Sequence, residues 1–444
     1  MQCIGLDIGS TTIKGAVLDL RQHELRGVVQ RPFPQPLVGL PVGFFEVDPQ
    51  AVVSIAEEVA EQLLSQAPDA RAIFCAGQMG GMILVDQSGA ALTNYLSWRD
   101  QRSLQPHGQS SSHLQAIRDR WTGDELSELG NELQTGSVTS LLFWLAQQNL
   151  LPLVASTPAT IADFVIGRLC GCVPKMDPTQ AIGLIDLNSG EWHLRAFDAL
   201  GLHTIEWPKL ANYREPIGIW SIRGKPLACH ASLGDQPCAL KGIGLSRGEL
   251  SINVSTGSQV SQLTDRFIPG PYQSRCYFGG DFLNTITHLP AGRSLNVLLD
   301  LLTELARAEG VTLNRAWDYI ASSTSNSDGH GLNADLSFFA GPLGHCGSIE
   351  GITTDNLTVG NLFHAAFRNM ADNYRECMDR LCGDRSDLSL ALSGGLTRTV
   401  PVLRRLIEDR LRMPIRESEV AEETLLGLLK IAVEVYFQNT PSVT

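Results

Sequence analysis

The feature that most constrains the fold is a β-hairpin pattern that occurs twice in the chain. Residues 4–19 hold two β-rich runs around the tip Gly-Ser-Thr-Thr, and residues 249–263 hold two more around Ser-Thr-Gly-Ser. Such runs on both sides of a short glycine-containing tip predict antiparallel hairpins. The tips lie 245 residues apart, counted from Ser10 to Ser255, so each hairpin opens one half of the chain. This long-range repeat predicts a duplicated nucleotide-binding fold.

The hairpin tips carry the residues that an anion site requires. Gly9 lets a ligand approach the backbone, and the N–H groups and hydroxyls of residues 10–12 can converge on an anion. Asp7 stands beside this tip, and two adjacent negative groups favour a divalent cation such as Mg²⁺ between them. An ordinary hairpin with a Ser/Thr turn has the same local pattern. The second tip is what favours ligand binding.

Composition indicates a soluble globular protein and argues against some partners. The chain of 444 residues exceeds the usual size of one hydrophobic core, and its net charge of −13 disfavours non-specific binding to nucleic acid or anionic membranes. We find no apolar run of about eighteen residues and no signal-peptide pattern. Ten scattered cysteines without a Cys-x-x-Cys pair predict reduced thiols, and we expect a cytoplasmic protein.

A glycine-spaced stretch marks the expected boundary between two domains. Gly242, Gly244 and Gly248 directly precede the second hairpin. We therefore expect one domain over residues 1–243 and another over residues 244–444. A polyphosphate in the cleft between them would be held from both sides.

The segments between the hairpins alternate between helices and strands. Asp48 and Pro49 provide an N-cap and a first helical residue for an apolar stripe. Apolar strands at 72–76 and 388–392 each run into a glycine-rich turn, where α/β proteins expose ligand-binding groups. Further apolar stripes predict helices at 138–145, 161–169, 295–305, 363–381 and 401–411. Residues 188–225 show little periodicity and are expected to form surface connections.

Two further segments are candidates for chemistry, and each has an ordinary structural alternative. Asp235 follows a glycine in a turn, where an aspartate caps a helix far more often than it catalyses. Trp98 begins the run Trp-Arg-Asp-Gln-Arg, which can form a sugar platform because an indole face stacks on C–H bonds while charged groups bind hydroxyls. The alternative is a Trp packed over a surface cluster of ion pairs.

Six motifs fall in the order found in the FGGY carbohydrate kinases, which the chain resembles from Ile4 to about Phe437. The motifs are Asp-Ile-Gly-Ser-Thr-Thr (7–12), Gly-Gln-Met (77–79), Trp-Arg-Asp-Gln-Arg (98–102), Gly-Asp-Gln (234–236), Ser-Thr-Gly-Ser (255–258) and Ser-Gly-Gly (393–395). Each motif is weak alone, whereas six in this order are specific. By general likeness, residues 159–171, 252–260 and 357–381 most resemble sedoheptulokinases, with xylulokinases second.

The resemblance implies an α/β fold with two actin-like ATPase domains, ribonuclease H-like in their cores, and a cleft between them. It implies ATP- and Mg²⁺-dependent phosphate transfer to a hydroxyl of a ketose, sedoheptulose first, with xylulose or another pentulose or polyol as the alternative. Asp235 matches the general base, and Asp7 and Asp235 match the metal-binding carboxylates. The positions matched to the nucleotide site are Gly9, Ser10, Thr11, Thr12, Lys14, Thr256, Gly257, Gly394, Gly395 and Arg398. The positions matched to the sugar wall are Gln78, Met79, Trp98, Asp100, Arg102 and Gln236.

The chain departs from the family pattern in two places. Xylulokinase-like members carry His after Gln-Met, whereas Gly80 stands here. Losing an imidazole removes one polar contact and opens volume, which speaks against a plain xylulokinase and allows a larger or differently oriented sugar. Residues 341–350 also lack the Gly-Glu-Arg run common in relatives, so control of lid closure or assembly could differ.

Two other functions would use the same residues. An actin-like or chaperone-like ATPase would act on a protein partner, and a sugar-binding pseudokinase would bind ligands without transferring phosphate. Asp235 with Gln236 and the run at 98–102 favour the kinase, because a non-transferring ATPase has no need of a sugar wall. We expect ATP and a small sugar as partners, no nucleic acid and no membrane, with a homodimer as one possible assembly.

Overall fold

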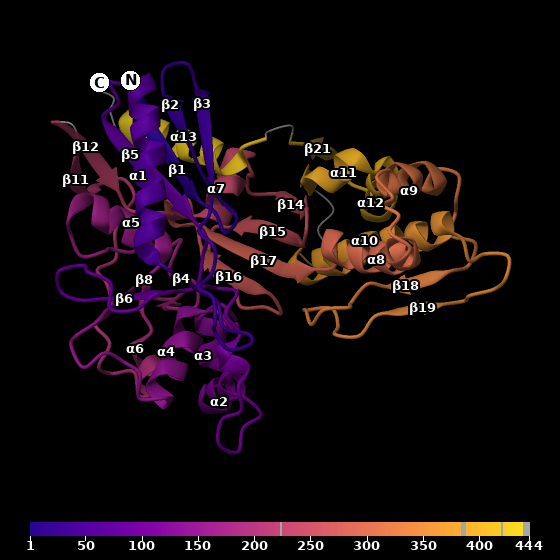
Figure 1. The fold of residues 1–444 in the computed structure, drawn as a ribbon, viewed down its shortest axis with the longest axis horizontal. Helices are drawn as coiled ribbons and strands as arrows, with labels where there is room; N and C mark the ends of the chain where they lie inside the picture. Colours follow the sequence, from indigo (N-terminus) through magenta and orange to yellow (C-terminus); the bar gives the residue numbers. More distant parts are fainter. Residues whose placement is uncertain (223, 383–387, 419–420, 438–444) are drawn as a thin grey trace.

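The computed structural model describes residues 1–222, 224–382, 388–418 and 421–437, and it has an α/β fold built on two mixed β-sheets. Figure 1 shows the first sheet with its helices at the upper left, and the second sheet near the centre with its helices to the right. We call these parts the first lobe and the second lobe. Among the described residues, no helix combines the length and apolar character needed to cross a bilayer.

The first predicted hairpin lies at the centre of the first sheet. The strand order is β11-β12-β5-β1-β2-β3, and β13 also pairs with β5. β1 is antiparallel to β2 and parallel to β5, so the sheet is mixed. The strands are β1 (Gln2–Ile8), β2 (Thr12–Asp19), β3 (Glu24–Pro32), β5 (Ala72–Gly77), β11 (Pro216–Ile222), β12 (Lys225–His230) and β13 (Leu233–Gly234). β11 shows that the expectation of mere connections across residues 188–225 was wrong.

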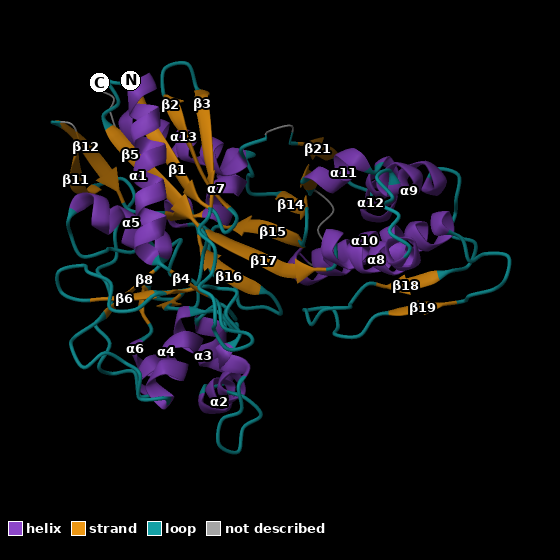
Figure 2. Ribbon diagram, viewed as in Figure 1, coloured by secondary structure: helices purple, strands orange, loops and turns teal. Residues whose placement is uncertain are grey.

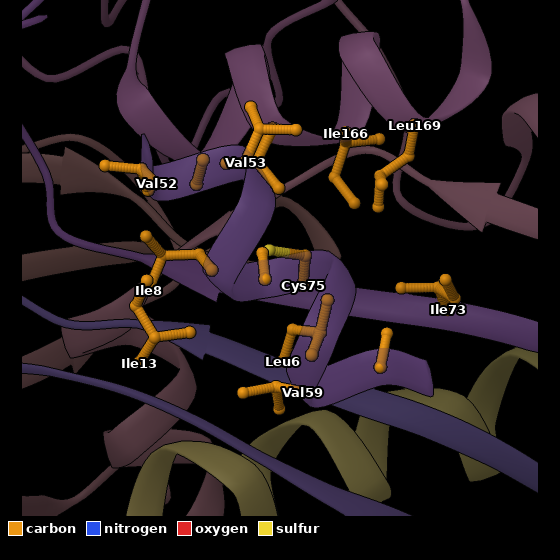
Figure 3. Packing of buried hydrophobic residues seen from close by; sticks show 14 of the residues in the cluster. Leu6, Ile8, Ile13, Val52, Val53, Val59, Ile73, Cys75, Ile166 and Leu169 are labelled. Carbon is orange, nitrogen blue, oxygen red and sulfur yellow. The ribbon is translucent and has the colours of Figure 1, made fainter. Parts of the chain in front are cut away.

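Helices α1 (Pro49–Gln66) and α5 (Ile161–Cys170) cover one face of the first sheet. Asp48 caps α1 by accepting from a backbone N–H of its first turn, and a proline follows at the first helical position, as predicted. Figure 3 shows Leu6 and Ile8 of β1 in this core, packed with apolar residues of both helices. Burial of this continuous apolar layer stabilises the sheet that carries the first tip.

The opposite face of the first sheet is covered by α7 (Asp235–Gly242) and by the C-terminal helix α13 (Glu423–Phe437). Cys3 and Leu18 point to this face because neighbouring side chains along a strand alternate between faces. The predicted second domain, 244–444, therefore includes a helix that packs in the first lobe. Its last seven positions, 438–444, lie outside the described residues.

A smaller region of helices and short strand pairs extends below the first sheet in Figure 1. It has its own buried core, in which Phe143, Phe197 and Trp121 pack together with aliphatic residues. Its elements are β4 (Glu46–Val47), β6 (Ile83–Val85), β7 (Tyr95–Leu96), η1 (Arg102–Leu104), α2 (His113–Arg120), α3 (Gly123–Glu128), α4 (Val138–Gln147), β8 (Thr157–Ala159), β9 (Ile185–Asp186), β10 (Glu191–Trp192) and α6 (Leu194–Asp198). The predicted helix at 138–145 is confirmed as α4.

The second sheet repeats the arrangement of the first around the second hairpin. Its order is β16-β17-β15-β14-β20-β21. In the second sheet, β14 is parallel to β20 and antiparallel to β15, and β15 is antiparallel to β17. In the first sheet, β1 is likewise parallel to β5 and antiparallel to β2, and β2 is antiparallel to β3. The strands are β14 (Glu249–Val254), β15 (Ser258–Thr264), β16 (Gln273–Cys276), β17 (Phe282–Leu289), β20 (Ser389–Ser393) and β21 (Ile415–Glu417). The duplication predicted from the tips is present in the topology.

The second lobe is completed by helices on the second sheet and a small hairpin (Figure 2). Phe363, Phe367 and Tyr374 of the long helix are fully buried, which confirms the predicted core stripe. The elements are η2 (Phe278–Gly280), α8 (Gly292–Ala308), α9 (Ala316–Thr324), β18 (Asn333–Asp335), β19 (Ser348–Glu350), α10 (Val359–Cys382), α11 (Gly395–Thr399) and α12 (Pro401–Leu411).

The turn after β20 gives a test of this packing. Gly394 has a φ of 100°, and a Cβ built there would lie 2.2 Å from the carbonyl oxygen of Val254. Gly394→Ala should therefore lower the free energy of unfolding by at least about 2 kcal/mol. The matched control is Gly395→Ala. Gly395 is the first residue of α11, and a Cβ there would meet no atom within 4 Å. Thermal unfolding midpoints of the two variants should diverge, and equal midpoints would contradict this account of the turn.

Candidate active site

A cavity of about 370 Å³ lies where the first sheet, the smaller helical region and the second sheet meet. Its walls come from parts of the chain that are distant in sequence, from the first tip to α13. The lining residues include Ser10, Gln78, Met79, Gly80, Trp98, Glu132, Gln134, Asp235, Gln236, Gln259, Arg275, Thr287 and His288. Five residues from the predicted base and sugar wall thus face one cavity, together with a residue of the first tip.

Strand register brings the key polar residues to one edge of the first sheet. The last residues of β1 and β13 both pair with the last residue of β5, in parallel register. Asp7 is the penultimate residue of β1, Gln78 follows β5 directly, and Asp235 follows β13 directly. Their side chains therefore gather where these three strands end.

Asp7 and Asp235 occupy an electrostatically costly site. Burial raises the pKa of Asp235 to about 6, although the backbone N–H of Gln236 donates to its Oδ1 at 2.8 Å. Burial, and then the charge of Asp235, raise the pKa of Asp7 to about 7, while Lys14 opposes the rise. Two carboxylates that lose hydration in this way are stabilised in their charged forms by a nearby cation.

The pair of aspartates is suited to Mg²⁺ held partly by other ligands. The described residues contain no group of three or more His, Cys, Asp and Glu side chains arranged for a metal. A cation beside Asp7 and Asp235 would take its other ligands from phosphate oxygens and water, which is the usual coordination of Mg²⁺ at phosphate sites. The donor set thus fits Mg²⁺ with a nucleotide and does not form a closed protein cage.

The first tip is tight and flanked by two cations. A Cβ at Gly9 would lie 2.8 Å from the carbonyl oxygen of Thr12, so only glycine fits without a shift. Lys14 donates to both carboxylate oxygens of Glu422, at 2.8 and 3.2 Å. Arg99 donates to the Oγ of Ser10 at 2.9 Å. Thr11 is exposed at the tip.

The second tip is anchored on the start of α8. The carbonyl oxygens of Ser255 and Thr256 accept from the N–H groups of Gly292 and Arg293 at 3.1 and 2.7 Å. Thr256 and Gly257 remain exposed. The tip is therefore held in place with its hydroxyl-bearing residues open to a ligand.

The predicted adenosine residues lie beside the second hairpin. A Cβ at Gly394 would meet the carbonyl group of Val254, the last residue of β14, whereas a Cβ at Gly395, which begins α11, would meet open space. Arg398 is exposed on the same short helix and opposes the pKa rise that burial causes at Glu423 of α13. These residues and the second tip share one edge of the second sheet.

The sugar-wall prediction separates into two groups. Gln78, Met79, Trp98 and Gln236 line the cavity, whereas Asp100 and Arg102 do not. Gln78 is 3% exposed, and its Nε2 has no hydrogen-bond partner among the described residues. Gln236 donates from its Nε2 to the Oε1 of Gln259 at 3.1 Å.

Asp100 and Arg102 form a buried network instead of a sugar surface. Arg102 donates to the Oδ2 of Asp100 at 2.8 Å and to the Oε1 of Glu46 at 2.6 Å. Asp100 also accepts from the backbone N–H of Phe45 at 2.7 Å. The two residues are only two positions apart, so the guanidinium folds back onto the carboxylate of its own loop. This corrects their placement on the sugar wall: they hold the loop that presents Trp98.

Several cavity residues were missed by the sequence analysis. Arg275 of β16 donates to the Oε2 of Glu132 at 3.2 Å, and both side chains are buried. The ion pair of Arg275 and Glu132 links the helical region to the second sheet, and Arg275 also donates to the Oε1 of Gln236. Thr287 and His288 of β17 complete this wall, and His288 has a left-handed φ of 62°. No local pattern marked these residues, because only tertiary packing brings them together.

Comparison with known families decides the identity. The model for the N-terminal domain of the FGGY family of carbohydrate kinases matches residues 2–228, which is more than half of the chain. The chain belongs to the FGGY family. This confirms the family that the six motifs indicated.

This FGGY chain is similar to a curated xylulose kinase in sequence and to solved kinase structures in fold. The xylulose kinase of Bacillus subtilis (strain 168) is 24% identical over 226 residues, which span 48% of this chain and 42% of the relative, so the match covers less than half of that protein. The ligand-bound xylulose kinase structure from Lactobacillus acidophilus covers 99% of this chain and 90% of its own, with 18% identity and a TM-score of 0.83. Plasmodium falciparum glycerol kinase with ADP covers 98% and 90%, with 16% identity and a TM-score of 0.82. The predicted fold class is confirmed.

The raised pKa values predict how the FGGY chain responds to pH. In the unfolded chain an aspartate has a pKa near 3.8, whereas Asp235 has one of about 6 in the folded protein. The folded state therefore binds more protons than the unfolded state between these pH values. The contribution of Asp235 to the free energy of unfolding is greatest below about pH 4 and falls as the pH rises to about 6. Asp235→Asn should raise the free energy of unfolding by about 1 to 3 kcal/mol at pH 8 and by much less at pH 4.

The measurement is the thermal midpoint of the full chain without ligands at both pH values. Asp69→Asn is the control, because Asp69 lies exposed in a turn and should give no pH-dependent gain. A gain for Asp235→Asn that is the same at both pH values would contradict the electrostatic account.

Proposed function

We propose that this chain is an ATP-dependent kinase that transfers the γ-phosphate of ATP to a hydroxyl of a ketose. The observation that carries the proposal is one cavity shared by Asp235, the Gln78 amide and Ser10 of the first tip. A buried amide donor without a partner is costly in the free protein, and a hydroxyl oxygen of a sugar would satisfy it. Membership of a carbohydrate kinase family supports the same reaction class.

The proposed reaction needs one base and a positioned phosphate. The sugar oxygen bonds to the γ-phosphorus while the bond from phosphorus to the β,γ-bridging oxygen breaks, and ADP leaves with that electron pair. The proton of the sugar hydroxyl passes to the carboxylate of Asp235. A pKa of about 6 leaves this group ionised at neutral pH and able to accept a proton. The kcat/KM for Mg-ATP, which reports the free enzyme, should therefore rise as the pH passes through this value.

The nucleotide would lie between the two tips. The N–H groups and hydroxyls of residues 10–12 and 256–257 would donate to phosphate oxygens, and residues 394–395 would lie against the adenosine. Mg²⁺ beside Asp7 and Asp235 would supply positive charge to the phosphates and the leaving group. Lys14 and Arg398 are the cations that the resemblance assigns to this site.

Sedoheptulose and xylulose are the two candidate sugars. General likeness of the sequence favours sedoheptulose, whereas the matching Bacillus subtilis protein is a xylulose kinase. Gly80 lines the cavity with a φ of 77°, a conformation that disfavours a larger residue. Gly80 brings no imidazole to the cavity, which suits a longer or differently oriented ketose, so we place sedoheptulose first and xylulose second.

A coupled assay across ketoses and polyols of four to seven carbons tests the proposal. ADP formation should require a sugar and should peak with one of the two candidate ketoses. Asp235→Asn should lower kcat by about 10² to 10⁴ because it removes the base, with the fold retained. ATP turnover that is equal without sugar would favour an actin-like ATPase. Binding of Mg-ATP and sugar without a phosphorylated product would favour a pseudokinase.

Gln78 gives a separate test of the sugar wall. Gln78→Leu should raise the KM for the sugar about 10-fold while the KM for ATP stays unchanged, because one hydrogen bond to the sugar is lost. Gln78→Leu should not destabilise the protein without ligands, because the amide N–H donors of Gln78 make no hydrogen bond that the substitution would break.

The matched control is Gln180→Leu in the same protein core. Gln180 donates from its Nε2 to the carbonyl oxygens of Leu233 at 2.8 Å and Gly77 at 3.3 Å. Its loss should lower the thermal midpoint because two buried carbonyl groups lose their donor. An unchanged KM for the sugar in Gln78→Leu would contradict the proposal that Gln78 binds the sugar.

A further inference from the structure

The two cations beside the first tip differ in their partners. Lys14 is paired with Glu422 through both carboxylate oxygens. Arg99 forms no ion pair with any carboxylate in the described part of the chain, and its one side-chain hydrogen bond goes to the neutral Oγ of Ser10. A guanidinium carries five N–H donors and stays charged at any relevant pH, so most of its capacity is unused here.

Arg99 is held in a defined orientation without a carboxylate. Its guanidinium carbon lies 5.6 Å from the ring centre of Phe45 and 5.4 Å from that of Trp98, within the range of cation–π attraction. Its backbone N–H donates to the Oγ of Ser97 at 3.2 Å. The loop that carries it is fixed by the buried network of Asp100 and Arg102. A charged group that is positioned in advance suits catalysis by electrostatic stabilisation.

The hydrogen bond to Ser10 places the Arg99 guanidinium beside a residue that lines the cavity, although Arg99 itself is not one of the lining residues. Burial is the main cause that raises the pKa of the Tyr95 hydroxyl; Asp235 raises it further, and Arg99 lowers it. Both charged groups therefore act on one buried hydroxyl. Arg275, which lines the cavity, differs from Arg99 because it is paired with Glu132.

We infer that Arg99 binds the γ-phosphoryl group of ATP together with Ser10 and stabilises it during transfer. This inference rests on the proposed kinase function. In the transfer step written above, charge spreads over the three non-bridging oxygens of the γ-phosphoryl group as its bond to the bridging oxygen breaks. The N–H groups of Arg99 donate to these oxygens, whereas ADP, which lacks them, gains nothing from Arg99.

The test compares two nucleotides with and without the arginine. Arg99→Gln should weaken binding of the non-hydrolysable analogue Mg-AMPPNP at least 10-fold while binding of Mg-ADP changes less than about twofold, as measured by calorimetry. The kcat for sugar phosphorylation should fall about 10²-fold or more. Arg99→Lys, which keeps the charge but not the fork of donors, should recover part of the AMPPNP affinity.

Two controls separate this role from a structural one. Arg26→Gln makes the same chemical change on β3, where Arg26 pairs with Asp19 and Glu24 far from the tip, and should leave both affinities unchanged. Added guanidinium ion should partly restore the kcat of Arg99→Ala, which a purely structural role would not allow.

The outcomes also separate this inference from the proposed function. Equal losses of AMPPNP and ADP affinity, or unchanged affinities with unchanged kcat, would overturn the assignment of Arg99. A wild-type protein that phosphorylates no sugar would overturn the kinase proposal. Because the nucleotide titrations contain no sugar, a selective loss of AMPPNP affinity in Arg99→Gln would still support the assignment.

Discussion

The structure depends on the parallel pairing of each hairpin with the strand that lies beside it. In the first sheet β5 pairs with both β1 and β13, and all three strands end at the same level. This register places Asp7, Gln78 and Asp235 together, although they are far apart in the sequence. A shift of one residue would turn alternate side chains to the other face, so the buried apolar layers on both faces keep the site in register.

Much of this arrangement could be predicted from local patterns. The hairpins, the capped helix after Asp48 and the strands before the glycine turns have short-range signals, and the structure contains each of them. The placement of Asp100 and Arg102 was wrong because nothing local tells an inward ion pair from a ligand-binding one. The pair of Glu132 and Arg275 joins the smaller helical region to the second sheet, so only the folded chain reveals it. The domain limits 1–243 and 244–444 stay a prediction.

The site combines features that would be unfavourable in a protein without a ligand. Two aspartates lose hydration, an amide donor lacks a partner, an arginine lacks a carboxylate and a histidine adopts a left-handed backbone conformation. Each lies around or beside one cavity. Charged and polar ligands could satisfy these groups together, because phosphate, a divalent cation and sugar hydroxyls supply the missing partners. Burial of the surrounding apolar cores offsets the unfavourable free energy of these groups in the folded protein.

The position of α13 has a consequence for how the protein is made. The first sheet has all its strands once β13 is complete, yet one of its faces is covered in part by a helix from the far end of the chain. A ribosome therefore releases this sheet with an apolar surface uncovered until about two hundred further residues have been synthesised. The first lobe can bury this part of its surface only after the second lobe has been synthesised, and the nascent chain must stay soluble during that interval.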